Sequence, residues 1–125
     1  MQIDTKVKEL KYRLENVENR IRKSAIDCQR DPQSIRLVTV SKTMSTKRVK
    51  EAIDAGVEIL GENYIQEARE KIDRFSSYPV SWHFIGHLQT NKAKYAVRLF
   101  DLIHSVDSLK LAVELNKQAK KLNKV

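Results

Sequence analysis

The stretch LVTVSKTMSTKRVKEAIDAG, residues 37–56, contains one complete strand–helix unit and decides the fold class. Its β-branched and aliphatic residues predict a strand over 35–41. Residues 45–48 open the helix that follows, and Gly56 is well placed as its C-terminal cap. Lys42 stands at the end of the strand, where a charged side chain is unusual, so its role becomes the main question of this sequence.

The same strand–helix rhythm recurs three more times along the chain. Further strands are predicted at 57–60, 81–85 and 102–106, with helices at 64–72, 91–99 and from Asp107 or Ser108 onward. A leading helix over 1–31 precedes these units and ends at Asp31-Pro32. Its apolar stripe consists of Ile3, Val7, Leu10, Leu14, Val17 and Ile21.

One helix followed by four βα units over 35–125 predicts a single α/β domain with parallel strands. Two architectures satisfy this order, an open doubly wound sheet and four units of a (β/α) barrel. The sequence has 3 glycines, and they do not form the Gly-rich fingerprint of dinucleotide-binding folds. A complete eight-stranded barrel needs about 250 residues, whereas this chain has 125.

The composition is that of a basic globular protein. There are 24 Lys and Arg against 16 Asp and Glu, which gives a net charge of +8. The cations are dispersed over several predicted helices without base-stacking aromatics between them, so specific nucleic-acid binding is not expected. No apolar run is long enough to span a bilayer, and Cys28 has no partner for an internal disulfide. We therefore expect a cytoplasmic protein without membrane association.

Candidate functional residues follow from the parallel sheet. In such folds the working side chains lie at the carboxyl ends of the strands. This rule selects residue His83 inside the third strand and four segments that follow strands, 41–43, 61–63, 86–90 and 105–107.

Lys42 alternates with Val38 and Val40, so the three side chains are predicted to face the same side of the sheet. If that side is an apolar interior, desolvation lowers the pKa of the amine and suits it to Schiff-base chemistry. The alternative is that Lys42 extends out of the strand end and pairs with Glu62. Strand position alone does not separate these two interpretations.

The remaining candidates have simpler interpretations. The three histidines lack the spacing of metal ligands, so no metal site is expected. His83 reads as a core histidine bonded to backbone groups, and His104 as a structural residue of the fourth strand. Asn63 is a possible N-cap. Residues 89–92 read first as a helix start, although their amides and lysine also suit a weakly specified anion.

Five stretches of the sequence resemble the pyridoxal-phosphate homeostasis protein family, which is related to the N-terminal barrel of alanine racemase. They are VSKT (40–43), EAIDAG (51–56), GENYIQEA (61–68), WHFIGHLQTNK (82–92) and HSVDS (104–108). The stretches are long and have the order and spacing of the family. The resemblance implies a (β/α)8 TIM-type barrel, of which this chain would form the N-terminal half.

The resemblance also implies a cofactor and a site. Pyridoxal 5'-phosphate would be held as a Schiff base on Lys42. Asn63, His83 and Ser105 match family positions that line the cofactor pocket. The family is tied to vitamin B6 and amino-acid homeostasis without a firmly assigned turnover, so we expect a cofactor carrier rather than an established enzyme.

The chain departs from the family in length, since it stops after the fourth βα unit. In the family the later strands supply the loop that grips the phosphate and an arginine beside the pyridine nitrogen, so neither is expected here. An open half-barrel leaves two sheet edges and an apolar inner face, so three alternatives are open: the chain is a fragment of a longer product, two copies associate through the open half-barrel, or another chain supplies the missing strands. The alternative functions are a pyridoxal-phosphate-dependent racemase-like enzyme, for which a second acid/base is lacking, and a non-catalytic basic interaction module.

Overall fold

Four short parallel strands form one sheet in the computed structural model, which describes residues 5–125. The strands lie in chain order, as β1 (Thr39–Val40), β2 (Ile59–Glu62), β3 (Ser81–Phe84) and β4 (Leu102–Ile103). The register aligns Val40 with Gly61, Gly61 with His83, and His83 with Leu102. Because the strand order does not reverse, this sheet lacks the switch point of a doubly wound fold.

Helices follow each strand as predicted. The α-helices are α1 (Thr5–Asp27), α2 (Thr46–Asp54), α3 (Ile65–Arg74), α4 (Ala93–Leu99) and α5 (Leu109–Lys121), and the short 3-10 helices are η1 (Pro32–Ser34) and η2 (Thr90–Lys92). Ser45 caps α2 by accepting the N–H of Arg48 at 3.2 Å. Ser108 caps α5 in the same way, accepting the N–H of Leu111 at 3.1 Å.

The leading helix ends earlier than the predicted range of 1–31. It ends at Asp27, and Gln29 then takes a positive φ of 60°, which is incompatible with a continuing right-handed helix. Asp31 caps η1 instead, accepting the N–H of Gln33 at 3.0 Å. Ile3 of the predicted stripe lies outside the described residues.

The strands β1 and β4 are also shorter than predicted, for a reason that a single strand's sequence does not contain. Both are edge strands, and each has hydrogen-bonding partners on one side. The ladder between β1 and β2 pairs Thr39 with Leu60 and Val40 with Gly61, and residues 35–38 are not part of it. Likewise β4 pairs with β3 at Leu102 and Ile103, where β3 ends.

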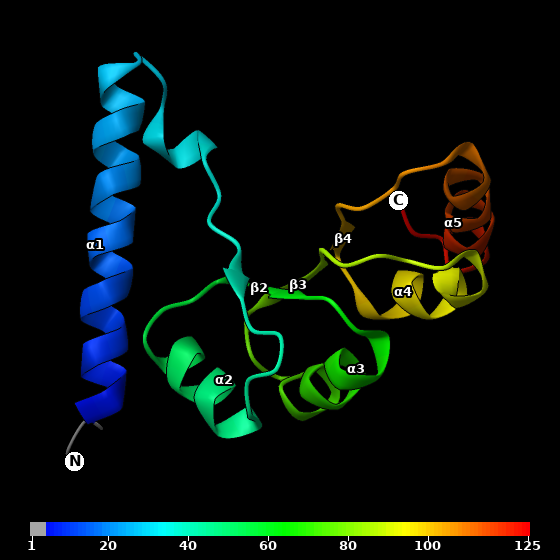
Figure 1. The fold of residues 1–125 in the computed structure, drawn as a ribbon, viewed down its shortest axis with the longest axis horizontal. Coiled ribbons are helices and arrows are strands. Elements are labelled where there is room, and N and C mark those ends of the chain that lie inside the picture. Colours follow the sequence, from blue (N-terminus) through cyan, green and yellow to red (C-terminus); the bar gives the residue numbers. More distant parts are fainter. Residues whose placement is uncertain (1–4) are drawn as a thin grey trace.

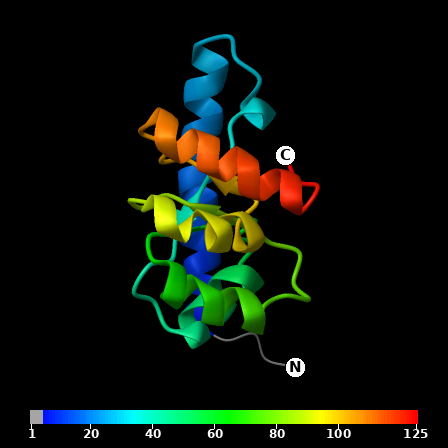
Figure 2. The ribbon, with the colours of Figure 1, turned by 90° about the vertical axis from the view of Figure 1, so that its right-hand side faces the viewer.

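One side of the sheet is covered by helices. α2, α3, α4 and α5 follow one another along that side, and α1 packs against α2 (Figure 1). Figure 2 shows α5, α4 and α3 one below another, with α1 crossing behind them. Leu60 and Phe84 point from the strands into this layer and are fully buried, and they form the core with Val49, Ala68 and Leu111. This layer supplies most of the apolar burial.

The opposite side of the sheet is open, and we call it the open face. It carries Val38, Val40, Gly61, His83 and Leu102, which alternate with the helix-facing residues. Val40 and Leu102 are 49% and 47% exposed. Within residues 5–125 no helix is long and apolar enough to cross a membrane.

Candidate functional site

Lys42 lies in a β-turn that follows β1. The turn comprises residues 41–44 and is closed by a hydrogen bond from the Met44 N–H to the Ser41 carbonyl at 3.1 Å. Thr43 has a positive φ of 65° at the third position of the turn, as type II turns require. Lys42 itself is exposed. This chain therefore does not surround the amine with the apolar interior that strand alternation suggested.

The predicted pairing of Lys42 with Glu62 is not formed. Glu62 is completely buried on the helix-facing side, and its partner is Lys71 of α3, with Nζ 3.0 Å from Oε1. No hydrogen bond or ion pair of Lys42 occurs within residues 5–125, so its side chain is free on the surface.

Asn63 and Ser105 each present a buried oxygen that has no hydrogen-bond partner in the described part of the chain. Asn63 directly follows β2 and Ser105 follows β4, and the unsatisfied atoms are Oδ1 and Oγ respectively. Asn63 does not cap α3, because the N-cap position is Tyr64, which makes no side-chain cap hydrogen bond. Buried polar atoms without partners are rare in native structures and need an explanation, such as a ligand.

His83 is buried in β3, and its interaction differs from the expected backbone contacts. Its Nδ1 lies 2.9 Å from Nε2 of His104, so one of these nitrogens carries the proton and the other accepts it. Burial lowers the pKa of His83, and His104 and Arg36 lower it further, against an opposing effect of Asp101. His83 is therefore predominantly neutral at neutral pH.

The sheet brings three of the four predicted residues to one edge. Lys42, Asn63 and Ser105 follow the carboxyl ends of β1, β2 and β4, while His83 lies one layer deeper on the open face. The tight approach of Gly86 to Asn63 fixes this edge, since a Cβ on Gly86 would lie 2.7 Å from the Asn63 Cα. No hydrogen bond links any two of the four residues in the described part of the chain.

A buried polar network beneath Lys42 was not foreseen from the sequence. Lys71 Nζ donates to the Ser41 carbonyl at 2.6 Å, to Glu67 Oε1 at 2.8 Å and to Glu62 Oε1 at 3.0 Å. The Ser41 hydroxyl bonds to Glu62, and the Thr43 N–H donates to Glu67. We call these five residues the turn network.

A signal for the turn network is present in the sequence. The residues of α3 that the sheet buries are Ala68 and Lys71, with Phe75 after the last turn, so Lys71 occupies the apolar stripe at helical spacing. A lysine in such a stripe requires a buried anionic partner. Glu67, four residues earlier, is one such partner.

The pKa of Glu67 reflects its hydrogen bonds with Lys71 and Thr43. Burial alone would raise the pKa of the Glu67 carboxyl, but the hydrogen bonds from Lys71 and the Thr43 N–H outweigh it and hold the pKa below its usual value. Glu67 is therefore ionised at neutral pH and accepts both hydrogen bonds as a carboxylate.

A pocket of about 710 Å³ opens at the carboxyl ends of β2 and β3. Asn63 lines it together with Arg69 and Lys92. Both cations also lie over the ring of Tyr95, at 5.1 and 5.8 Å from its centroid. This positive wall agrees with the anion preference expected for residues 89–92.

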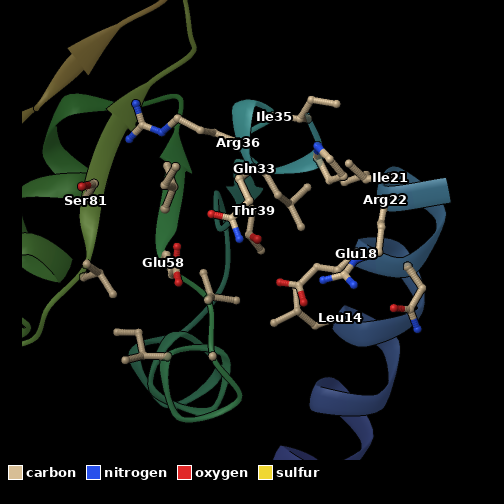
Figure 3. A pocket seen from close by; sticks show the side chains of 18 of the residues that line it. Leu14, Glu18, Ile21, Arg22, Gln33, Ile35, Arg36, Thr39, Glu58 and Ser81 are labelled. Atoms are coloured by element: carbon tan, nitrogen blue, oxygen red, sulfur yellow. The ribbon is translucent and has the colours of Figure 1, made fainter. Parts of the chain in front are cut away.

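A larger groove lies at the other end of the strands and is not the predicted site. Its volume is about 1010 Å³, and it separates α1 from the amino ends of β1, β2 and β3. Figure 3 shows Glu18 and Arg22 of α1 on one side of this groove and Glu58 on the other. None of the four predicted cofactor residues lines it. In parallel α/β folds the functional edge is the opposite one.

The described residues contain no group of three or more His, Cys, Asp or Glu side chains arranged to hold a metal ion. Cys28 is exposed and unpaired as a free thiol.

The sequence is similar to curated proteins over most of its length. The chain is 42% identical over 113 residues to the pyridoxal phosphate homeostasis protein of Escherichia coli K12, covering 88% of this chain and 48% of that protein. The protein of the same name from Synechocystis is 47% identical over 94 residues, covering 74% of this chain and 43% of the relative. This chain is homologous to the pyridoxal phosphate homeostasis proteins. It spans about half the length of the curated relatives it matches.

Solved structures extend this similarity to the fold. PipY of Synechococcus elongatus, solved with pyridoxal phosphate bound, has a TM-score of 0.70 and 41% identity, covering 82% of this chain and 48% of PipY. A protein of unknown function from Bifidobacterium adolescentis has a TM-score of 0.80 and 29% identity, covering 98% of this chain. No protein-family model matches the sequence.

Proposed function

We propose that this chain carries part of a pyridoxal 5'-phosphate site, in which the cofactor is held as a Schiff base on Lys42. The proposal is supported by homology to pyridoxal phosphate homeostasis proteins and by the bound cofactor of PipY. The observation that carries it is the pair of buried, unsatisfied oxygens of Asn63 and Ser105 at the edge where Lys42 lies. Both atoms fit a ligand that offers hydrogen-bond donors or bridging water.

The chemistry of such a site requires a neutral amine. When bound, pyridoxal 5'-phosphate supplies an aldehyde; the Lys42 nitrogen adds to the aldehyde carbon, and loss of one water leaves a C=N bond. His83 would contribute a neutral imidazole on the open face, and Asn63 and Ser105 would orient the bound ring. This assignment makes the chain a carrier with a role in vitamin B6 and amino-acid homeostasis, resident in the cytoplasm.

We further propose that the sheet is the N-terminal half of a (β/α) barrel. Sequential strand order and helices along one side are the arrangement of a singly wound barrel. The open face would then be the barrel interior, which explains why Val40 and Leu102 remain exposed. The site within these 125 residues would be incomplete at the phosphate, so weak binding or pairing of two open faces is expected.

The alternative functions gain no support from the described residues. The tyrosines near the candidate loops are Tyr64 and Tyr95. Tyr95 lies on α4 with Arg69 and Lys92 over its ring, and Tyr64 is the exposed N-cap residue of α3. Exposed cations are found on α1, α2 and α5 rather than in one groove, which does not favour a dedicated nucleic-acid surface.

Reductive trapping tests the proposed site. Pyridoxal 5'-phosphate is added to the 125-residue chain, the absorption band of the Schiff base is recorded, and borohydride then fixes the C=N bond as a secondary amine. Peptide mass mapping is expected to place the modification at Lys42. Lys42→Ala should abolish it, whereas Lys47→Ala, which removes an exposed lysine at the start of α2, should not. Equal modification of all exposed lysines contradicts the proposal.

A further inference from the structure

Lys71 is a buried cation that contacts the turn carrying Lys42, both directly and through Glu62 and Glu67. Its side chain is 4% exposed, and its three ammonium protons are matched by the Ser41 carbonyl, Glu67 and Glu62. The Glu62 side chain is 0% exposed. A charge cluster this deep is costly to desolvate, and apolar residues of similar volume often stabilise a fold as well or better. Stability alone therefore does not account for it.

Hydrogen bonds hold the backbone of the turn on both sides of Lys42. On the N-terminal side, the Ser41 N–H donates to the Gly61 carbonyl at 2.9 Å, the Ser41 hydroxyl bonds to Glu62, and the Ser41 carbonyl accepts from Lys71. On the C-terminal side, the Thr43 N–H donates to Glu67. The position of the Lys42 Cα is thus set by its two neighbours, while its side chain stays free.

The backbone conformation of Thr43 shows that these hydrogen bonds hold the turn against the residue's own conformational preference. Its φ of 65° is in the left-handed region, which a β-branched residue adopts only under constraint from its surroundings. The constraint here is the Thr43 N–H bond to Glu67, and Glu67 is held in turn by Lys71. Backbone strain beside a reactive side chain is typical of a functional position.

We propose that Lys71, together with Glu62 and Glu67, is a positioning device that holds the 41–44 turn and leaves the Lys42 amine free to react. This inference rests on the proposed function of Lys42. The network acts in two ways: it fixes the backbone on either side of Lys42, and it engages the two nearby carboxylates. Lys71 pairs with both carboxylates, Glu62 at 3.0 Å and Glu67 at 2.8 Å, and so balances the negative charge next to the turn.

The first test needs no cofactor. Amide hydrogen exchange of Thr43 and Met44, followed by NMR, reports whether the turn is held. Lys71→Met and Glu67→Ala are expected to exchange at these two amides about tenfold or more faster than the wild type. Lys50→Met is the matched control, because Lys50 and Asp54 form an exposed pair with the same four-residue spacing and a 2.8 Å distance. Unchanged exchange in folded Lys71→Met and Glu67→Ala overturns the proposal.

The second test measures reactivity at Lys42. In Lys71→Met the turn is no longer held, so the share of borohydride trapping that falls on Lys42 rather than on Lys47 should drop about tenfold or more. A purely structural role of Lys71 would lower the thermal midpoint without changing this distribution between the two lysines in the folded protein. Glu67→Ala decides the matter if Lys71→Met fails to fold, since Glu67 is partly exposed.

A double variant tests whether the losses expected in Lys71→Met can be partly reversed. Glycine adopts positive φ without strain, so Thr43→Gly in the Lys71→Met background should restore part of the lost exchange protection and trapping. The absence of any rescue contradicts a role exerted through the turn. The two proposals fail separately: a wild-type chain that is not trapped at Lys42 rejects the cofactor site, whereas normal trapping in folded Lys71→Met rejects the positioning device alone.

Discussion

The helix-facing side of the sheet buries Leu60, Glu62 and Phe84 completely, whereas the open face leaves Val40 and Leu102 about half exposed. The same four strands present both sides, so strand propensity does not cause the difference. The helices α2 to α5 cover one side, and no residue in 5–125 covers the other to the same degree. The closed side therefore determines stability, and the open side is available for a ligand or another polypeptide.

The largest expected effect on the free energy of unfolding comes from a substitution on the closed side of the sheet. Phe84 is 1% exposed, and its ring packs against that of Phe100 with centroids 5.1 Å apart. Phe84→Ala is expected to lower the free energy of unfolding by about 3–5 kcal/mol. Leu102→Ala, on the open face, should change it by less than about 0.5 kcal/mol. Urea denaturation of both variants measures the difference, and equal losses would show that the open face is covered in solution.

A smaller effect on stability is expected at the carboxyl ends of the strands, where Gly86 lies against Asn63. A methyl group at Gly86 would press on the Asn63 backbone, so Gly86→Ala should cost about 1–3 kcal/mol and displace Asn63. Gly56 offers the comparison, because it has a φ of 111° but its nearest neighbour would be 3.7 Å from an added Cβ. Gly56→Ala should cost about 1 kcal/mol through backbone strain alone. Thermal unfolding and the amide chemical shifts of Asn63 separate the two mechanisms.

Much of the closed side was predictable from sequence. The alternation of apolar strands and amphipathic helices predicted the element order. Residues 45–48 marked the start of α2 correctly, and of the two caps offered for the last helix, Asp107 or Ser108, the structure uses Ser108. The lengths of β1 and β4 were not predictable, because both are edge strands and their extent depends on pairing with a single neighbour, β2 or β3. A residue's own neighbours in sequence contain no information about that register.

The edge of the site was only partly predictable. The strand-end rule selected the segments that carry Lys42, Asn63 and Ser105, but one of the two interpretations left open for Lys42 paired it with Glu62, a contact that the structure does not form. The correct partner, Lys71, is nine residues from Glu62 and becomes its neighbour when α3 packs on the sheet. The contact between His83 and His104 likewise depends on the register of β3 and β4. Such tertiary pairings of charged or titratable groups require the fold before they can be assigned.

The open face should also respond to pH through His83. Its folded pKa lies below the unfolded value of 6.5, so the unfolded chain binds the proton more readily. Stability is therefore full above pH 6.5 and is lost as the pH falls through the folded pKa, with a slope of at most about 1.4 kcal/mol per pH unit for one proton. His83→Gln should flatten this slope. His87→Gln, which alters an exposed histidine, should leave it unchanged in pH-dependent urea titrations.

The smallest effect on stability is expected at Lys42, the residue with the largest proposed effect on function. Its side chain is exposed and has no partner in residues 5–125, so Lys42→Ala should shift the free energy of unfolding by less than about 0.5 kcal/mol. The same variant should lose all trapping of pyridoxal 5'-phosphate at this position. A stability loss comparable to that of Phe84→Ala would mean that Lys42 is part of the packing, and the contrast between a closed, stabilising side and a free reactive edge would not hold.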